Sequence, residues 1–525
     1  MKTLSKSKYT LSCKCQKALW LKTYKPEEEV IDPSVEARFA AGTEVGNLAK
    51  SLFGDYVETT SYTADGGLDI AAMIAKTQEL VNCGCPVICE AAFAPMHHYC
   101  AVDILCKEGE GWAIYEVKSS TSHVGDDHTN SKFGKYANDI AYQRWVLEQC
   151  GIRVTGTYLV TINSDYVRHG DLVLKTTASG NGLFNIIDLG PLVENEYLKV
   201  HNQSLLALQT LEQITEPEMP LSMHCHEPYP CAFWRYCTQH LPKPSVFDVY
   251  GGNGRAGFTF AKKLDFYHAG KIAFEDLAGK RIGKIQDMQI NCTSNKTDHI
   301  NPAGIQKFLA KVRYPLYFLD FESMQPVVPI FDDTTPYMQI CFQYSLHYIE
   351  HEGGELQHKA FLAPSDGSDP RRPLAEALCR DIPRDACVMV YNKTFEKTCI
   401  EKMASIYPDL QAHLMDIHAH IIDLRDPFSY GHYYRPAMNV TFPSASGMFS
   451  IKSVLPALYP NDPSLDYHNL STLVQHGGDA MTIFPKIQHM GPEEAAEARQ
   501  ALLDYCHLDT LAMVKIWEKL IEVVK

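Results

Sequence analysis

WAIYEVKSS, at residues 112–120, decides the fold of the first half of the chain. It is apolar around Glu116 and Lys118, and residues two apart in a strand share one face. Two similar runs precede it, VICEAAFA at 87–94 and YCAVDILC at 99–106, and the charged residues 107–111 read as a turn. These runs predict a meander of strands with a small polar group on one face.

Helical patterns flank this meander. Small and apolar residues recur at helical spacing over 36–53, and a second helical stretch covers 138–149, where Gly151 provides a stop. TGTYLVTIN at 155–163 predicts a further strand. The sequence therefore predicts an α/β unit, and residues 1–240 form the first expected domain.

A second α/β unit begins at YPLYFLDFES, residues 314–323. The run Leu316 to Phe321 is nearly all apolar, as expected of a strand buried on both faces. Further strands are expected at 338–349 and 386–391, and helices at 371–380, 394–407 and 493–518. We expect a helical connector at 241–311 and a second α/β domain at 312–525.

Composition excludes several classes of protein. Apolar residues make up 45% and charged residues 21% of 525 residues, as in ordinary globular proteins. No apolar run reaches the roughly 18 residues of a membrane span, and the first fifteen residues lack the apolar centre of a secretory signal. We expect a cytoplasmic protein without membrane contact, in which the 17 cysteines are reduced or bind metal.

The first candidate site combines Asp103, Glu116 and Lys118, with Glu90 as a further acid. A hairpin would bring Asp103 to the edge that bears Glu116 and Lys118. Two carboxylates and a lysine suit a divalent metal, Mg²⁺ or Mn²⁺, and the water that it activates for phosphodiester attack. An isolated Glu-x-Lys pair is usually just the polar face of a strand.

This order of motifs resembles the PD-(D/E)XK nuclease superfamily, and within it the RecB-type nucleases. The resemblance implies a restriction-endonuclease-like fold in which Asp103 and Glu116 bind metal and Lys118 assists. Gln143, next to Tyr142, would occupy the last motif, and GTEVG at 42–46 the first. Two departures stand out, because the family's usual first-motif histidine is absent and its last motif is not an adjacent Tyr-Gln pair.

A cysteine cluster follows this domain. Cys225, Cys231 and Cys237 are evenly spaced, and Cys15 or Cys13 offers a fourth thiolate. Four thiolates make a closed site for zinc or for an iron–sulfur cluster, with His224 and His226 as substitute ligands. A subset of RecB-type nucleases is similar, and the resemblance implies a [4Fe–4S] cluster on Cys15 and the three later cysteines, with Zn²⁺ as the alternative.

The second candidate site lies in the C-terminal half. Asp320 and Glu322 end the strand at 314–323, Glu396 lies in the first turn of a later helix, and Tyr505 and Asp509 are one helical turn apart. Four converging carboxylates need a counter-charge. Two metal ions about 4 Å apart are a frequent solution in phosphoryl chemistry, and a tyrosine can orient the attacking water.

The ordered series DFE, YNxxFE, SIKSVLPAL and YxxxD resembles the DEDD exonucleases of the ribonuclease-H-like fold, in their tyrosine-containing branch, over about residues 312–522. The resemblance implies that Asp320, Glu322, Glu396 and Asp509 hold two Mg²⁺ or Mn²⁺ ions and that Tyr505 positions the water. Glu396 departs from the family's aspartate. The nearby acids that could contribute are Asp416, Asp423 and Asp426.

The two halves together resemble a bacterial family that joins a RecB-type domain to a ribonuclease-H-like domain. We expect a metal-dependent nuclease acting mainly on DNA, with a 3′–5′ exonuclease site in the C-terminal half and a second nuclease site in the N-terminal half. Trp234 and Tyr236 could stack single-stranded bases. The alternatives are a nucleic-acid-binding scaffold with one or both sites inactive, and an exonuclease that acts on RNA.

Overall fold

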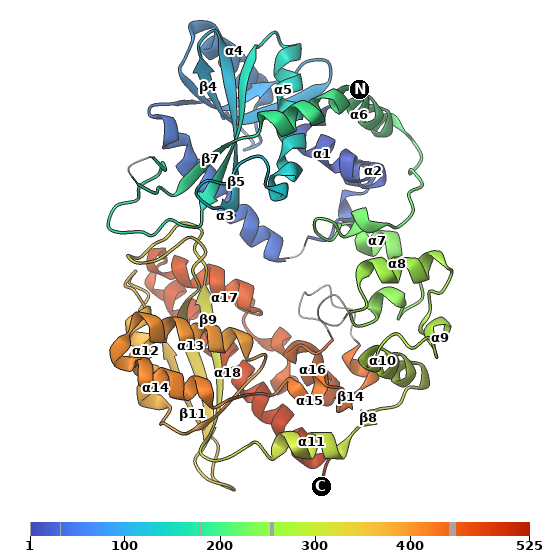
Figure 1. The fold of residues 1–525 in the computed structure, drawn as a ribbon, viewed down its shortest axis with the longest axis vertical. Coiled ribbons are helices and arrows are strands. Elements are labelled where there is room, and N and C mark those ends of the chain that lie inside the picture. Colours follow the sequence, from blue (N-terminus) through green and yellow to red (C-terminus); the bar gives the residue numbers. More distant parts are fainter. Residues whose placement is uncertain (1, 32, 178–179, 252–256, 440–447) are drawn as a thin grey trace. The chain divides into compact units, whose positions relative to one another are not determined.

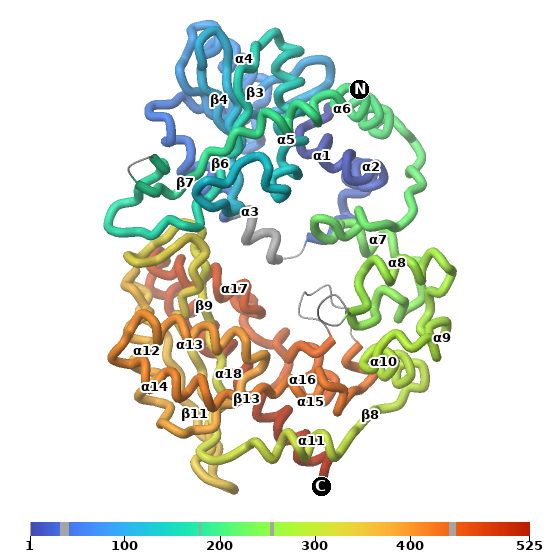
Figure 2. Tube along the Cα trace, viewed as in Figure 1, coloured from blue at the N-terminus to red at the C-terminus, as the bar shows by residue number. Residues whose placement is uncertain are grey.

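A computed structural model describes residues 2–31, 33–177, 180–251, 257–439 and 448–525, with only the backbone for 33–40. The chain forms two compact units, residues 1–239 with 326–338, and residues 240–325 with 339–525. The expected connector, 241–311, lies within the second unit. The segment 326–338, which joins two strands of the second unit, belongs to the first (Figures 1 and 2).

The first unit is built on one mixed sheet. Strands β3, β4 and β5 form an antiparallel meander, β6 runs parallel to β5, and β7 is antiparallel to β6. The expected strands at 87–94, 99–106, 112–120 and 155–163 are confirmed. The strands are β1 (Leu4–Ser5), β2 (Val57–Glu58), β3 (Val87–Phe93), β4 (His98–Glu108), β5 (Gly111–Ser122), β6 (Val154–Asn163) and β7 (Phe184–Asp188).

Helices cover both faces of this sheet. On one face, Ile114 of the sheet packs in a core with residues of α5 and α6, and on the other face Tyr115 packs near Val45 of α3 and Val327 and Val328. The helices are α1 (Lys6–Lys14), α2 (Gln16–Tyr24), α3 (Pro33–Ala49), α4 (Ile70–Cys83), α5 (Gly134–Gln149), α6 (Gly190–Glu212) and α7 (Trp234–Thr238). The helices expected at 36–53 and 138–149 correspond to α3, with a 3-10 turn after it, and to α5.

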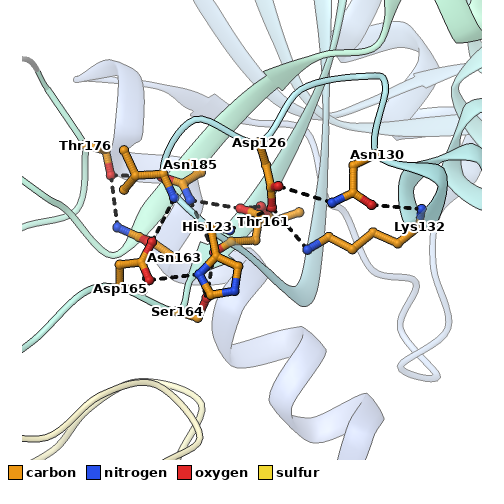
Figure 3. Close-up of polar contacts among 12 residues, drawn as sticks. His123, Asp126, Asn130, Lys132, Thr161, Asn163, Ser164, Asp165, Thr176 and Asn185 are labelled. Carbon is orange, nitrogen blue, oxygen red and sulfur yellow. Dashed lines mark hydrogen bonds and ion pairs between the residues drawn. The ribbon is translucent and has the colours of Figure 1, made fainter.

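A polar network orders the connection from β5 to α5 (Figure 3). His123 Nδ1 lies 2.8 Å from Asp165 Oδ1. Asp126 accepts hydrogen bonds from Asn130 Nδ2 and from Lys132 Nζ, each at 3.1 Å. These contacts fix the loop that leads from the strand of Glu116 to the helix of Gln143.

The second unit contains a five-stranded sheet of order β11-β10-β9-β12-β13. β10 is antiparallel to β9 and to β11, whereas β12 is parallel to β9 and to β13. The strands are β9 (Leu316–Met324), β10 (Ile340–Ile349), β11 (Gln357–Leu362), β12 (Cys387–Val390) and β13 (Ile421–Asp423). The strands expected at 314–323, 338–349 and 386–391 are confirmed.

The two faces of this sheet carry different helices. Leu319 and Leu346 pack in a core with α12 (Arg371–Asp381), α13 (Thr394–Ile406) and α14 (Pro408–Ala419). On the opposite face, the Phe318 ring lies 5.7 Å from Trp517 of the long helix α18 (Pro492–Glu522). Because side chains alternate along a strand, Asp320 and Glu322 share the α18 face with Phe318.

The remaining elements of the second unit are short. They are α8 (Phe260–His268), α9 (Phe274–Leu277), α10 (Lys284–Asn295), α11 (Pro302–Leu309), α15 (Asp426–Ser429), α16 (Ile451–Leu458), α17 (Gly477–Ile483) and the pair β8 (His299–Ile300) and β14 (Tyr433–Tyr434). The expected α/β class is confirmed for both units. In the described residues, no helix has the length and apolar character needed to cross a membrane.

Candidate functional site

Three acids lie side by side on neighbouring strands of the first unit. The β3–β4 register pairs Cys89 with Ile104 and Ala91 with Val102, on either side of Glu90 and Asp103, and the β4–β5 register pairs Ile104 with Tyr115, the neighbours of Asp103 and Glu116. The backbone N–H of Val117 donates to Asp103 Oδ2 at 2.8 Å. The hairpin expected from the sequence therefore brings Asp103 next to Glu116.

Glu116 is the most enclosed of these acids, with no exposed surface. Lys118 Nζ donates to its Oε1 at 2.6 Å, and Gln143 Nε2 donates to its Oε2 at 2.7 Å. Burial alone would raise the pKa of Glu116, but the ammonium groups of Lys118 and Lys6 outweigh it and hold the pKa at about 2. The two lysines thus favour the ionised form of Glu116.

Lys6 and Asp139 also belong to this site, and the sequence analysis missed both. Lys6 Nζ lies 3.0 and 3.1 Å from the two carboxylate oxygens of Glu116 and 3.8 Å from Asp103 Oδ1. Lys118 Nζ also contacts Asp139 Oδ2 at 3.2 Å. Burial would lower the pKa of Lys6, but Glu116 and Asp103 raise it above its usual value. The Lys6 ammonium occupies the position of a cation between the two predicted metal ligands.

The other predicted residues of the first unit differ in placement. Burial raises the pKa of Glu90 to about 7, the charge of Asp103 adds to this, and Lys50 Nζ lies 3.9 Å from Glu90. Tyr142 does not face the acids, because its hydroxyl donates to the backbone oxygen of Leu4 at 2.6 Å. Its role is to hold β1 against the sheet.

In the second unit, the side chains of Asp320 and Glu322 lie next to Cys506 of α18. One ligand atom each of Asp320, Glu322 and Cys506 lies within 4.8 Å of the others. Cys506 Sγ lies 3.7 Å from Asp320 Oδ2. The paired acids of β9 and the C-terminal helix thus form one cluster, although the sequence analysis gave Cys506 no role.

Asp509, the fourth predicted ligand, is held by a neighbouring tyrosine. The Tyr467 hydroxyl donates to Asp509 Oδ1 at 2.6 Å, and the rings of Tyr467 and Tyr505 lie 6.0 Å apart. Lys452 Nζ lies 4.7 and 4.9 Å from the centroids of these two rings and donates to the Gln475 backbone oxygen at 2.9 Å. Lys452 lies in SIKSVLPAL, one of the ordered motifs of the second half. The sequence analysis gave this lysine no role.

Glu396 lies in the first turn of α13 and is buried. Among the residues that the structure describes, its Oε2 atom has no hydrogen-bond partner. Asp423 fixes the start of this helix, because its carboxylate accepts from the backbone N–H groups of Asn392 at 2.9 Å and Lys393 at 3.1 Å. Asp423 is therefore a positioning residue for Glu396, at the end of the strand β13.

The other two nearby acids have different partners. Asp416 accepts from the backbone N–H of Asp385 at 2.8 Å, and Asp426 lies 3.9 Å from Lys311 Nζ. The structure therefore gives neither acid a contact with the predicted ligands.

Burial and like charge act together on the acids of the second site. Burial raises the pKa of Asp320, Glu322 and Glu396 well above the usual range, and neighbouring acids of the same group raise each further. Burial also raises the pKa of Asp509, although Lys452 opposes this. Hard carboxylate oxygens are the donors that Mg²⁺ and Mn²⁺ prefer, so these residues fit such ions.

The four predicted cysteines line one pocket. Cys15 comes from the start of α2, and Cys225, Cys231 and Cys237 come from the segment around α7. Burial raises the pKa of Cys237 to about 12, and the other three thiols add to this effect. A set of four thiols fits a thiophilic metal or cluster. Cys13 instead lies with its Sγ 3.4 Å from Gln203 Oε1.

Further polar and aromatic side chains lie around the four cysteines. His224 also lines the pocket. The Tyr236 hydroxyl donates to Glu216 at 2.7 Å, and the Trp234 ring meets His226 edge-on at 4.7 Å.

Comparisons with known proteins give similarities of limited extent. Residues 317–442 match the family model described as "Domain of unknown function (DUF2779)". The "Uncharacterized protein MG366 homolog" of Mycoplasma pneumoniae is 27% identical over 217 residues, which is 39% of this chain and 32% of that protein. The "Uncharacterized protein UU173" of Ureaplasma parvum is 26% identical over 287 residues, or 53% of this chain and 39% of that protein.

No solved structure matches the chain. The matched regions cover less than two fifths of the length of either curated relative. The matched family region includes β9 with Asp320 and Glu322, and α13 with Glu396.

Proposed function

We propose that the chain is a metal-dependent nuclease that acts mainly on DNA, with a 3′–5′ exonuclease site in the second unit. The observation that carries this proposal is the set of carboxyl groups on β9, α13 and α18 whose burial and charges raise the pKa of Asp320, Glu322 and Glu396, and in which Glu396 Oε2 has no hydrogen-bond partner among the described residues. Buried acids of like charge are costly unless a cation compensates them. The α18-facing acids of β9 support a ribonuclease-H-like fold of DEDD type.

Asp320, Glu322, Glu396 and Asp509 would hold Mg²⁺ or Mn²⁺. When bound, the ions would lower the pKa of the attacking water and offset the charge on the phosphate. Tyr505 would orient the water, and Tyr467 fixes the rotamer of Asp509 through its 2.6 Å hydrogen bond. Water adds to phosphorus as the bond to the 3′ oxygen breaks, which releases a nucleoside 5′-monophosphate and leaves a 3′ hydroxyl.

The first unit would carry a RecB-type PD-(D/E)XK site, in which Asp103, Glu116 and Glu90 bind metal and Lys118 assists. Gln143 supports this assignment, because its amide donates to Glu116 at 2.7 Å. Lys6 favours a second candidate function for this unit. Because its ammonium already pairs with Glu116 and Asp103, the unit could bind nucleic acid without cutting it.

The cysteine pocket would hold a [4Fe–4S] cluster on Cys15, Cys225, Cys231 and Cys237, with Zn²⁺ as the alternative. The four thiols that line one pocket support either group. Bound there, the group would join the N-terminal helices α1 and α2 to α7. That link would keep Lys6, in the first turn of α1, next to Glu116.

The test is the digestion of matched single-stranded DNA and RNA oligonucleotides with Mn²⁺. We expect the wild type to shorten the DNA, and the variant Asp509→Asn, which keeps the side-chain volume, to lose at least 100-fold in rate, as typical of lost metal or transition-state ligands. Asp504→Asn, an exposed position on the same helix, is the matched control. Digestion of RNA alone would support the RNA exonuclease, and no digestion of either polymer would support the binding scaffold.

A further inference from the structure

Three histidines meet on the α18 face of the second sheet, outside both carboxylate sites. His347 lies on β10 and His358 lies directly opposite it on β11. His507 comes from α18, between Tyr505 and Asp509 in sequence. The ring centroids are 4.6, 4.8 and 4.5 Å apart, and one ring nitrogen of each lies within 4.8 Å of the others.

Hydroxyl groups orient two of these rings. His347 Nδ1 lies 2.8 Å from Thr510 Oγ1, and His358 Nε2 lies 2.9 Å from Ser345 Oγ. Ser345 Oγ and Thr510 Oγ1 are themselves 2.8 Å apart. A histidine held at one ring nitrogen by a hydrogen bond has its tautomer and orientation fixed and presents the other nitrogen to a metal.

The surroundings favour the neutral form of His347 and His358. Burial lowers the pKa of His347 to about 3 and that of His358 to about 4, and the neighbouring imidazoles lower both further. Neutral imidazoles are the form that binds transition metals.

We propose that His347, His358 and His507 bind one transition-metal ion of the zinc class. Imidazole nitrogens suit Zn²⁺, Ni²⁺ or Cu²⁺, whereas the oxygen ligands near Asp320 suit Mg²⁺ or Mn²⁺. Three protein ligands leave a fourth position open to water. The ion fastens α18 to the outer hairpin of the sheet, β10 with β11. Since α18 also carries Tyr505 and Asp509, the site stabilises the helix that presents them.

The experiment measures zinc on the full chain, after equilibration with Zn²⁺ and removal of excess. Three proteins are compared, the wild type, His358→Ala and His351→Ala. His358 and His351 are both exposed and lie on the same hairpin, so neither change is expected to prevent folding. The cysteine pocket and the carboxylate clusters are identical in all three proteins. Any zinc bound at those sites is therefore the same in each and does not affect the difference between them.

We expect His358→Ala to hold one zinc fewer per chain than the wild type, while His351→Ala holds the same amount as the wild type. Added zinc should raise the melting temperature of the wild type and of His351→Ala by more than that of His358→Ala. His507→Gln, which removes a ligand from the helix, should reproduce the loss. Equal zinc content and equal zinc-dependent melting shifts in all the proteins would overturn the proposal, whether or not the chain proves to be a nuclease.

Discussion

Lys452 is the residue on which the charge balance of the second carboxylate site depends. Burial lowers the pKa of Lys452, although Asp509 and Glu322 oppose this. Its ammonium in turn lowers the pKa of Asp320, Glu322 and Asp509, which burial raises. The lysine therefore helps these acids to stay ionised, as metal binding requires.

The variant Lys452→Met should need a higher pH for activity. Without the ammonium, the carboxyl groups bind protons more tightly, so the acidic limb of the rate profile moves to higher pH. A displacement of about one pH unit would lower the rate about tenfold on that limb. The profile of kcat/KM against pH measures this, with Lys486→Met, an exposed position, as the control. An unchanged acidic limb would show that Lys452 does not act on these acids.

In the first unit, Lys6 affects how strongly Glu116 can bind a metal ion. Because its ammonium lies 3.0 Å from Glu116, it competes with any metal ion for that carboxylate. Lys6→Met should therefore strengthen Mn²⁺ binding at Asp103 and Glu116, by about tenfold for one removed charge pair in a partly buried site. Titration calorimetry with Mn²⁺ checks this, and Lys8→Met on the same helix should bind as the wild type does. Weaker binding in Lys6→Met would mean that the lysine supports the metal site.

The acids of both sites could be placed from the sequence, because spacing within one strand or one helix decides which side chains share a face. Asp320 with Glu322, and Tyr505 with Asp509, are such pairs. Lys6 could not be assigned, since it contacts Glu116 from 110 positions away and no local pattern marks it. The hydrogen bond from Tyr467 to Asp509 could not be predicted for the same reason, because the two residues are 42 positions apart in the sequence.

At the scale of elements, the strands with apolar runs were predictable and the polar ones were not. β11 has mostly exposed residues and lies at the edge of its sheet, so it has no apolar alternation to mark it. β11 carries His358, one of the three histidines of the proposed zinc-class site. The N-terminal elements β1, α1 and α2 also escaped prediction, since they are fixed by distant partners such as Tyr142 and the cysteine pocket.

The link between α2 and α7 gives a prediction about the cysteine pocket. Cys15→Ser should lose the bound metal or cluster, because it removes one of four ligands, and the melting temperature should fall by several degrees as the binding energy is lost. Cys13→Ser is the matched control, since Cys13 contacts Gln203 instead. Metal analysis and thermal unfolding measure both effects. Loss of the metal in Cys13→Ser but not in Cys15→Ser would reverse the assignment.

At the scale of the whole molecule, the chain leaves the second sheet after β9, contributes residues 326–338 to the first unit and returns as β10. Val327 and Val328 are buried in the core of the first unit. The Tyr337 hydroxyl donates to the backbone oxygen of Ser119 at 2.5 Å, one residue after Lys118. Sequence analysis had divided the chain at 240 and 312, because local patterns carry no information about such a long-range insertion.

The variant Val328→Ala should destabilise the first unit by about 1–3 kcal/mol, the cost of removing buried methyl groups from a packed core. Ile330→Ala, whose side chain is 40% exposed in the same segment, should change stability by much less. Hydrogen exchange of the β5 and β6 amides reports the stability of this unit. Equal exchange in both variants would mean that the segment does not contribute to the core of the first unit.

The most direct test of the central claim is the release of nucleotides from end-labelled single-stranded DNA with Mn²⁺, measured for Asp320→Asn, Lys118→Met and the wild type. We predict that Asp320→Asn abolishes the stepwise release of nucleoside 5′-monophosphates, while Lys118→Met retains it. Lys135→Met, an exposed lysine of α5, serves as the control for Lys118. Stepwise release that continues unchanged in Asp320→Asn would contradict the assignment of the exonuclease to the second unit.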